Sequence, residues 1–142
     1  MKVEWVYRSY RVTDDQAVVD LEVVHSLLSV SYWAAGRPKD LTKRAIQNSL
    51  CFSVLLEGKQ VGFARVVTDY AVFAWIADVI IDPDHRGKGL GKFLIQCIQN
   101  HPEVPASLQM LRTQDAHGLY EKFGFKKGEV LQKKPERNTS DR

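Results

Sequence analysis

The spacing of hydrophobic residues changes several times along the chain, and each change predicts a different element. Aromatic and basic residues take turns over 5–12, which predicts a strand. Thr13 and Gln16 then stand three apart in the pattern of a capping box, and apolar residues recur at helical spacing over 14–29. A second helix is expected over 40–49. The chain is therefore expected to begin with one strand and two helices.

Three strands are expected in the middle of the chain. Residues 51–57 and 60–68 are rich in apolar side chains, and Gly58-Lys59 between them predicts a two-residue hairpin turn, because glycine accepts the positive φ that such turns need. Residues 72–81 are almost continuously apolar, which is typical of a central strand covered on both faces. We expect these strands to run antiparallel to one another.

The last third of the chain alternates helices and strands. Apolar residues at helical spacing from Leu90 onward predict a helix that begins near Lys88. A strand over 107–113, a short helix over 115–123 and a last strand over 125–131 follow. The predicted order is β-α-α-β-β-β-α-β-α-β, an α/β domain with a mixed, mainly antiparallel sheet.

Length and composition fit one globular domain. The chain has 142 residues, of which 44% are hydrophobic and 26% charged, and this excludes a disordered or a disulfide-rich chain. We expect a single domain over 1–131, followed by a polar C-terminal tail over 132–142. The formal net charge is only +3, which is too small an excess to favour a nucleic-acid partner.

Neither a membrane segment nor a metal site is expected. The N-terminus lacks the apolar stretch of a signal peptide, and no run approaches the roughly 18 apolar residues of a membrane span, so we expect a cytoplasmic protein. Cys51 and Cys97 lie far apart in apolar surroundings, which favours two buried free thiols over a disulfide. No Cys/His cluster has metal-ligand spacing.

The segment after the central strand has the composition of an anion-binding loop. It contains three glycines and three cations, namely Arg86, Gly87, Lys88, Gly89, Gly91 and Lys92. Glycines let the main chain approach a phosphate closely, and the helix that follows adds the unpaired N–H groups and the positive dipole end of its first turn. We therefore expect a polyanionic ligand at the start of this helix, although the net charge of the chain is small.

Two common phosphate-binding motifs do not fit this loop. A Walker A motif needs four residues between its glycines and Ser or Thr after the lysine, whereas three residues separate Gly87 from Gly91 and Phe93 follows Lys92. The dinucleotide fingerprint fails because Lys92 stands at the position of its third glycine. A nucleoside triphosphatase and a dinucleotide-binding enzyme are both disfavoured.

The run from Pro83 to Gly91 closely resembles the acetyl-CoA pyrophosphate loop of the GNAT superfamily of N-acetyltransferases. The family's usual Gln/Arg-x-x-Gly-x-Gly/Ala pattern would have Asp84 at its first position, a departure, but the related form Pro-x-x-Arg-Gly-x-Gly-x-Gly fits well. Residues 113–125 resemble the family's second signature, and residues 60–64 resemble its hairpin strand. On this resemblance the chain is identified as a small GNAT-like domain.

The resemblance implies that the fourth and fifth strands, 72–81 and 107–113, splay apart and hold acetyl-CoA as cosubstrate. The residues that it implies for cofactor binding are Val79, Ile80, Ile81, Arg86, Gly87, Lys88, Gly89, Leu90, Gly91, Lys92, Asp115 and Tyr120. A main-chain N–H near Val79 or Ile80 would face the thioester oxygen, where a preformed donor supplies about 3 kcal/mol. Asp115 stands where many members have Asn, and a helix-capping role for it stays open.

Two side chains are candidates for catalysis. Tyr120 matches the family's general acid, which donates a proton to the departing thiolate; a tyrosine that only packs is the alternative. Asp78 is the one carboxylate inside the apolar run 71–81, and we expect desolvation to raise its pKa toward that of a base. A substrate anchor, or a structural acid paired with Arg65, stays open for Asp78.

The acceptor side is expected at the connection between the first two helices. Tyr32 and Trp33 lie there, and an exposed pair of this kind is unusual unless it lines a pocket or packs as a lid; a small separate core cluster is the alternative. Arg37 and Arg65 would hold a carboxylate of the acceptor while Asp78 meets its amine. This combination suits an amino acid or a peptide-like acceptor.

The leading hypothesis is an acetyltransferase in which a primary amine of a small acceptor attacks acetyl-CoA directly in a ternary complex. One alternative is a non-catalytic acyl-CoA-binding or sensing module. Another is an enzyme that acetylates protein N-termini or lysines, which would need an open groove. Because the polar tail is a poor strand, the sheet either ends early or is completed by a partner chain in a homodimer.

Overall fold

The computed structural model describes residues 2–104 and 108–135. Its elements are β1 (Glu4–Tyr7), β2 (Tyr10–Thr13), the 3-10 helix η1 (Gln16–Val18), α1 (Leu21–Ser29), α2 (Lys39–Gln47), β3 (Leu50–Leu56), β4 (Lys59–Thr68), β5 (Phe73–Ile81), the 3-10 helix η2 (Pro83–His85), α3 (Leu90–Asn100), β6 (Leu108–Leu111) and α4 (His117–Glu121). None of these helices is long and apolar enough to cross a membrane.

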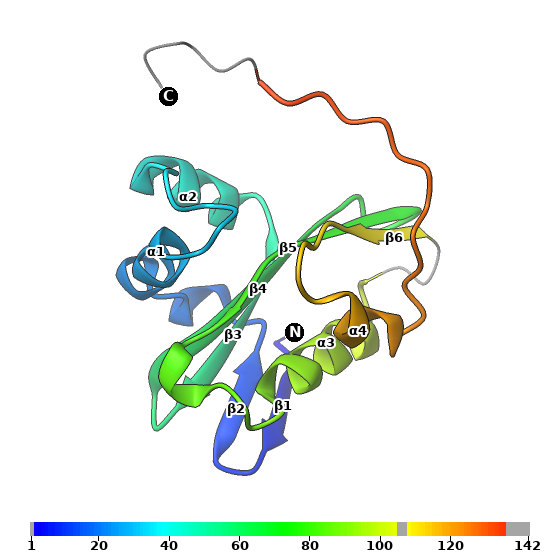
Figure 1. Ribbon diagram of the computed structural model, residues 1–142. Coiled ribbons are helices and arrows are strands. Elements are labelled where there is room, and N and C mark those ends of the chain that lie inside the picture. The colour runs from blue at the N-terminus through cyan, green and yellow to red at the C-terminus, as the bar shows by residue number, and fades with distance from the viewer. Residues whose placement is uncertain (1, 105–107, 136–142) are drawn as a thin grey trace.

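The six strands form one sheet whose order follows the chain from β1 to β6. Neighbouring strands are antiparallel except β5 and β6, which pair in parallel. Figure 1 shows α1 and α2 on one face of the sheet and α3 and α4 on the other. The predicted α/β class with a mixed, mainly antiparallel sheet is confirmed, and the central strands are covered on both faces.

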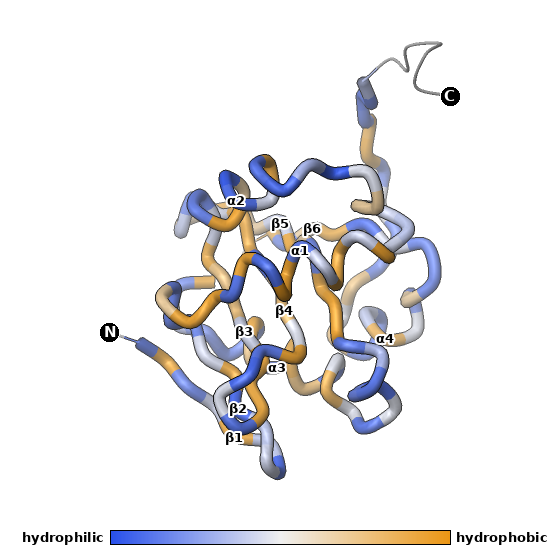
Figure 2. The backbone as a smooth tube through the Cα atoms, turned by 90° about the vertical axis from the view of Figure 1, so that its left-hand side faces the viewer, coloured by the Kyte–Doolittle hydropathy of each residue, from blue (hydrophilic) through white to orange (hydrophobic). Residues whose placement is uncertain are grey.

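Two apolar clusters fill the layers on either side of the sheet. The larger cluster joins strand residues such as Phe52 and Ile76 to Leu94 of α3. The smaller cluster joins Phe63 of β4 to Val24 of α1. Adjacent strand residues enter different clusters because side chains alternate between the faces of a sheet. Figure 2 accordingly shows orange, hydrophobic stretches along the central strands.

A β-bulge interrupts this alternation in β5. The register with β4 shifts between Ala77 and Ile80, so that Asp78 and Val79 lie opposite one residue of β4. Before the bulge the even-numbered Ile76 enters the larger cluster, whereas after it Ile80 enters the smaller one. The bulge therefore turns Asp78, with a φ of 52°, toward the side of the sheet that α1 and α2 cover.

The strands β5 and β6 pair over only part of their length. Their parallel register runs from Phe73 and Leu108 to Ile76 and Leu111, and β5 continues to Ile81 without β6 beside it. Figure 1 shows the chain turning away from β5 after β6, toward α4. The expected splay between the fourth and fifth predicted strands is thus present.

The N-terminal segment is a hairpin, so the prediction of one strand over 5–12 is wrong. Tyr7 pairs with Tyr10 across an antiparallel ladder, and the chain turns at Arg8 and Ser9. Arg8 adopts a φ of 56°, in the left-handed region. Arg8 and Ser9 are two adjacent polar residues, but the turn contains no Gly, Pro, Asn or Asp that would mark it clearly in the sequence.

The turn between β3 and β4 lies one residue earlier than predicted. Leu56 pairs with Lys59, so Glu57 and Gly58 form the two-residue loop. Their φ angles are 51° and 81°, and two positive values are what a type I′ turn requires. Gly58 thus occupies the second turn position rather than the first.

The predicted helix over 14–29 is divided in two. Gln16 does not close a capping box, because its side-chain amide donates to the Ile46 carbonyl at 2.8 Å. Asp15 instead caps η1, and Asp20 caps α1 by accepting from the Val23 N–H at 3.2 Å. Two aspartates therefore start two separate helical segments.

The last predicted strand is not formed, since 125–131 have no regular secondary structure. Phe125 packs against Tyr120, with ring centroids 6.0 Å apart, but the next four residues are Lys, Lys, Gly and Glu. Val130 and Leu131 are exposed, so the segment has no apolar face to bury. Completion of the sheet by a partner chain stays a prediction, and residues 136–142 of the predicted tail lie outside the described residues.

Candidate functional site

A cavity of about 570 Å³ lies where β5 and β6 diverge. The predicted site residues that line it are Tyr32, Trp33, Val79, Ile80, Ile81, Arg86, Gly87, Gly89, Leu90, Gly91, Asp115 and Tyr120. The other predicted site residues, Arg37, Arg65, Asp78, Lys88 and Lys92, lie outside its lining. Segments from four parts of the chain meet here because the sheet opens at this point.

The helix α3 begins without a side-chain cap. Its N-cap residue is Gly89, with a φ of 84°, and no side chain hydrogen-bonds its first turn. Gly87 also has a positive φ, 79°, which glycine adopts far more readily than other residues. The uncapped first turn of this 11-residue helix offers N–H groups and a positive dipole end to an anion. The residues present therefore fit a diphosphate group.

Two tyrosines of the N-terminal hairpin support this loop, and the sequence patterns did not indicate either. The Tyr7 hydroxyl donates to the Lys88 carbonyl at 2.7 Å, and the Tyr10 hydroxyl lies 2.9 Å from His85 Nδ1. A Cβ added at Gly89 would lie only 2.8 Å from the Tyr7 hydroxyl. Because Tyr7 is 81 residues from Lys88 in the chain, no local pattern could have revealed the contact.

The three cations of the loop lie in different surroundings. Arg86 lines the cavity, but its Nε donates to the Ile81 carbonyl at 2.9 Å, which holds the side chain against the end of β5. Lys88 Nζ lies 3.4 Å from the Tyr10 hydroxyl, and Lys92 is exposed on α3. The main chain of the loop, rather than its lysine side chains, thus borders the cavity.

Tyr120 is the buried phenol of the cavity. It lies on α4, is 9% exposed, and packs edge-to-face against Phe125. Burial raises the pKa of Tyr120 to about 12, and the nearby ionisable groups of Tyr32 and Asp115 act in the same direction. The phenol therefore stays protonated at neutral pH and is a hydrogen-bond donor there rather than a base.

Asp78 is a buried carboxylate beside the cavity, with 2% of its side chain exposed. Trp33 Nε1 donates to Oδ1 at 2.9 Å, and Arg65 Nε donates to Oδ2 at 2.7 Å. Arg37 donates through Nη1 to Oδ2 at 2.8 Å and through Nη2 to Oδ1 at 3.2 Å.

The pKa of Asp78 is lowered, and the expected rise is wrong. Burial acts to raise this pKa, but hydrogen bonds and positive charge from Arg37 and Arg65 outweigh burial and hold the pKa below its usual range. The sequence shows that the acid is buried but not which cations reach it. Its ion pair with Arg65, which the sequence left open as one alternative, is present.

Arg37 and Arg65, which were expected to bind a carboxylate of the acceptor, are instead paired with Asp78. Both guanidinium groups face Asp78, and Arg65 Nη1 also donates to Ser49 Oγ at 3.3 Å. The two arginines are therefore part of the scaffold that surrounds the carboxylate.

The connection between α1 and α2 forms the aromatic wall of the cavity. Tyr32 and Trp33 are in edge contact, 5.0 Å between ring centroids, and are 52% and 37% exposed. The Tyr32 hydroxyl accepts a hydrogen bond from the Gln114 N–H at 2.9 Å, on the loop after β6. Since Trp33 donates to Asp78 on β5, this pair links β5 to the loop after β6.

Asp115 lines the cavity and does not cap α4. The N-cap residue of α4 is Ala116, which lacks a capping side chain, and the Ala116 N–H donates to Thr113 Oγ1 at 3.0 Å. Within the described residues no side chain caps α4, so the capping role that stayed open for Asp115 is not filled, and Thr113 instead closes the turn that precedes the helix.

The two cysteines are buried and free, as predicted. Burial raises the pKa of Cys51 to about 11 and that of Cys97 to about 12. Neither lines the cavity, so both behave as packing residues. Within 2–104 and 108–135, no group of three or more His, Cys, Asp or Glu side chains could hold a metal ion.

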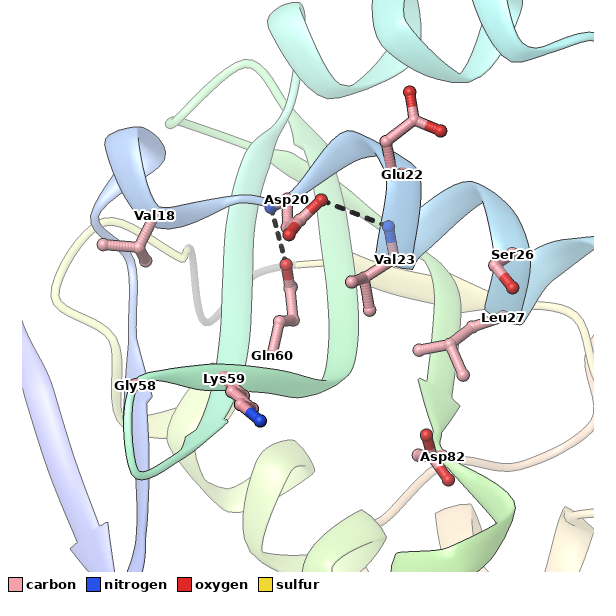
Figure 3. A pocket seen from close by; sticks show the side chains of 10 residues that line it. All are labelled: Val18, Asp20, Glu22, Val23, Ser26, Leu27, Gly58, Lys59, Gln60 and Asp82. Atoms are coloured by element: carbon pink, nitrogen blue, oxygen red, sulfur yellow. Dashed lines mark hydrogen bonds between the residues drawn. The ribbon is translucent and has the colours of Figure 1, made fainter.

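A second cavity, of about 620 Å³, lies beside the start of α1 and the β3–β4 turn. Figure 3 shows Asp20 accepting from the Val23 N–H and Gln60 accepting from the Asp20 N–H, the latter at 2.7 Å. Gln60 also donates to Ser53 Oγ at 3.0 Å. These polar groups cap α1 and tie it to the sheet, so we assign the chemistry to the cavity between β5 and β6.

The family model of the acetyltransferase (GNAT) domain matches residues 47–127, more than half of the chain. The chain belongs to the GNAT acetyltransferases. A crystal structure of the GNAT-family protein xcc2953 from Xanthomonas campestris pv. campestris is 40% identical to it, with a TM-score of 0.81. That alignment covers 93% of this GNAT acetyltransferase and 94% of the Xanthomonas chain, so the whole domain shares the fold.

Two further proteins are similar to this GNAT acetyltransferase. The uncharacterised N-acetyltransferase ycf52 of Gracilaria tenuistipitata var. liui is 38% identical over 114 residues, 75% of this chain and 62% of that protein. The chain thus spans less than two thirds of this algal relative. Glucosamine-6-phosphate N-acetyltransferase from Arabidopsis thaliana has a TM-score of 0.64 at 16% identity, over 90% of this chain and 99% of that one, which shows a shared fold alone.

Proposed function

We propose that this GNAT acetyltransferase transfers the acetyl group of acetyl-CoA to a primary amine of a small acceptor, by direct attack of the amine in a ternary complex. The observation that supports this most is a single cavity bordered by an uncapped helix start, a buried phenol and an aromatic wall. The thioester supplies an activated acetyl group, and the residues of the cavity bind and orient it.

The cofactor would lie along the end of β5. The loop 86–91 would bind the diphosphate through main-chain N–H groups, as the uncapped start of α3 favours. Val79, Ile80 and Ile81 border the cavity and have no β6 partner, so an extended arm would pair with them as an added strand does. A main-chain N–H of Val79 or Ile80 would donate to the thioester oxygen, where such a donor is worth about 3 kcal/mol.

Tyr120 would stabilise the departing sulfur. Its pKa of about 12 keeps the hydroxyl protonated throughout the physiological range. An ordinary thiol has a pKa near 8.5, so full proton transfer from this phenol to a thiolate is uphill. The phenol would therefore contribute chiefly as a hydrogen-bond donor while negative charge develops on the sulfur.

The proposed acceptor is small because the aromatic wall is fastened on two sides. The bond from the Gln114 N–H to Tyr32 and the bond from Trp33 to Asp78 hold the connection between β5 and the loop after β6. A polypeptide acceptor would need an open groove beside the thioester, which this wall does not favour.

Release of free thiol from acetyl-CoA in the presence of a panel of small amines tests the proposal. We expect turnover of at least one small amine, and initial-rate plots that intersect, as a ternary complex requires. Binding of acetyl-CoA by calorimetry with no amine turned over would favour the non-catalytic acyl-CoA-binding module. Turnover confined to peptides with a free N-terminus or lysine would favour the protein acetyltransferase instead.

A further inference from the structure

Asp78 is an anion whose hydrogen-bonding capacity is filled. Oδ1 accepts from Trp33 and Arg37, and Oδ2 accepts from Arg37 and Arg65. An ionised carboxylate offers about four acceptor positions, and four donors already occupy them. No position remains for the proton of an attacking amine, so the geometry argues against Asp78 as the general base.

The bulge in β5 explains how a buried acid reaches these donors. In a regular strand Asp78 would share the face of Ile76 and point into the apolar layer that α3 covers. The extra residue reverses this direction and leaves Asp78 with a φ of 52°. A non-glycine residue in the left-handed region persists where its surroundings hold it, and here four hydrogen bonds do so.

The donors come from separate elements. Trp33 and Arg37 lie in the connection between α1 and α2, whereas Arg65 lies on β4 and is itself bonded to Ser49. At its other side the same connection is bonded to the loop after β6 through Tyr32. Segment 31–37 is therefore bonded to β5 and to the loop after β6, and Asp78 provides the bond to β5.

We propose that Asp78 is a positioning residue, which holds Trp33 and Arg37 so that segment 31–37 stands as the acceptor-side wall of the cavity. Its kinetic consequence rests on the acetyl transfer proposed above. Its structural consequence, a wall that is ordered before any ligand binds, holds for the free protein and is tested separately.

Hydrogen exchange of the free protein tests the structural part. Asp78→Asn places an NH2 group, which only donates, among the arginine donors. We expect the amides of 31–37 to exchange about tenfold faster in D78N, with exchange in α3 unchanged. Trp33→Phe keeps an aromatic ring and loses the indole N–H, so exchange of the same amides should rise about threefold. If D78N does not fold, the exchange measured in W33F tests the proposal. Unchanged exchange in the folded variants overturns the proposal.

Kinetics with an acceptor from the amine panel test the consequence for the reaction. A displaced wall should raise the KM for the acceptor about tenfold in D78N and W33F, with the KM for acetyl-CoA within about twofold of wild type. The acidic and basic limbs of the pH profile of kcat should be the same in D78N and W33F as in the wild type. A general base would instead lose about 10²–10⁴-fold in kcat together with the acidic limb, and that result overturns the proposal.

Asp14 offers a matched control, because it is a buried carboxylate at another place in the fold. Its side chain is 9% exposed, accepts from the Val3 N–H at 2.7 Å, and lies 2.7 Å from His101 Nε2. Asp14→Asn should lower stability and leave both the exchange of 31–37 and the acceptor KM unchanged. An equal response of D14N and D78N would mean general destabilisation and would overturn the proposal. A wild-type protein that binds no acetyl-CoA contradicts the proposed function, whereas the exchange result still decides the role of Asp78.

Discussion

Asp78 and Tyr120 are two buried ionisable side chains beside one cavity, but Asp78 is charged at neutral pH and Tyr120 is not. Burial acts to raise both pKa values. Asp78 nevertheless ends below its usual range, because Arg37 and Arg65 surround it, whereas Tyr120 ends at about 12 with Tyr32 and Asp115 nearby. The partners of a buried group, more than its burial, therefore decide whether it is charged.

This difference separates two kinds of contribution to the site. A carboxylate that is charged and fully hydrogen-bonded holds its neighbours in place, which is the role that we propose for Asp78. A phenol that stays protonated at the cavity surface is free to donate toward a substrate, which is the role that we propose for Tyr120. Four measurements would break or sharpen this contrast.

The largest effect is expected from Tyr120→Phe. Losing the buried donor should lower kcat about 10²-fold, because the developing charge on sulfur loses its hydrogen bond, while the Kd for acetyl-CoA stays nearly unchanged. Thiol release and calorimetry measure the two quantities. Tyr70→Phe, at a tyrosine that is 54% exposed on the β4–β5 turn, is the control and should be neutral. A Y120F enzyme with wild-type kcat would leave Tyr120 as a packing residue.

Gly89→Ala tests the start of α3, which borders the cavity through main-chain geometry instead of a buried ionisable group. Alanine would have to adopt a φ of 84°, and its Cβ would lie 2.8 Å from the Tyr7 hydroxyl. Because both effects would shift the loop, we expect the Kd for acetyl-CoA to rise about tenfold. Tyr7→Phe in the same chain removes the clashing hydroxyl and should recover part of the loss. Gly128→Ala, where a Cβ meets nothing within 4 Å, is the matched control. Equal affinity of G89A and wild type would show that the loop does not bind the cofactor.

A smaller effect is expected in the pH dependence of stability. The pKa of Asp78 in the folded protein lies below its usual value of 3.8, so its ion pairs stabilise the fold above that pH. The contribution is lost as the pH falls through the folded pKa.

Arg37→Gln removes one of the two charges and should lower the free energy of unfolding on the order of 1 kcal/mol at pH 7. The difference from wild type should shrink below about pH 4 as Asp78 becomes protonated in both proteins. Urea unfolding between pH 7 and pH 3 measures it, with Arg44→Gln on the exposed side of α2 as the control. A difference that stays constant with pH would mean that Arg37 acts through packing rather than charge.

The smallest effect is expected at the cysteines. Their thiols are buried, with pKa values of about 11 and 12, so iodoacetamide at pH 8 should leave the folded protein unmodified. The variant in which Cys51 and Cys97 are both alanine should keep the rate of acetyl transfer. Loss of turnover with the fold intact would instead indicate a covalent acetyl-cysteine step.

Much of the fold was predictable where local patterns repeat over several residues. The apolar stripe from Leu90 predicted α3, and the continuous apolar run predicted the doubly covered β5. The errors lie where local patterns give no signal. The turn at Arg8 contains no Gly, Pro, Asn or Asp, and Val130 and Leu131 alone do not give 125–131 an apolar face to bury. Helix and strand periodicity is a local property, whereas burial depends on what lies opposite.

The functional site likewise has some features that the local sequence predicted and others that it did not. The loop 86–91 was recognisable because glycines and cations before a helix are contiguous in the chain. Tyr7 and Tyr10, which support that loop, were not, because they reach it only after the hairpin folds against α3. The acid at Asp78 was visible as an anomaly in an apolar strand, but its charge state was not.

The sequence by itself determined the α/β class, the order of most of the elements, and the glycine-rich, basic start of α3. It did so because these features depend on residues that are neighbours along the chain. Only the tertiary structure decided that a bulge turns Asp78 toward Arg37, Arg65 and Trp33, and that Tyr32 meets the loop after β6. Charge and position at such a site depend on distances between segments far apart in sequence, and those distances exist only once the chain has folded.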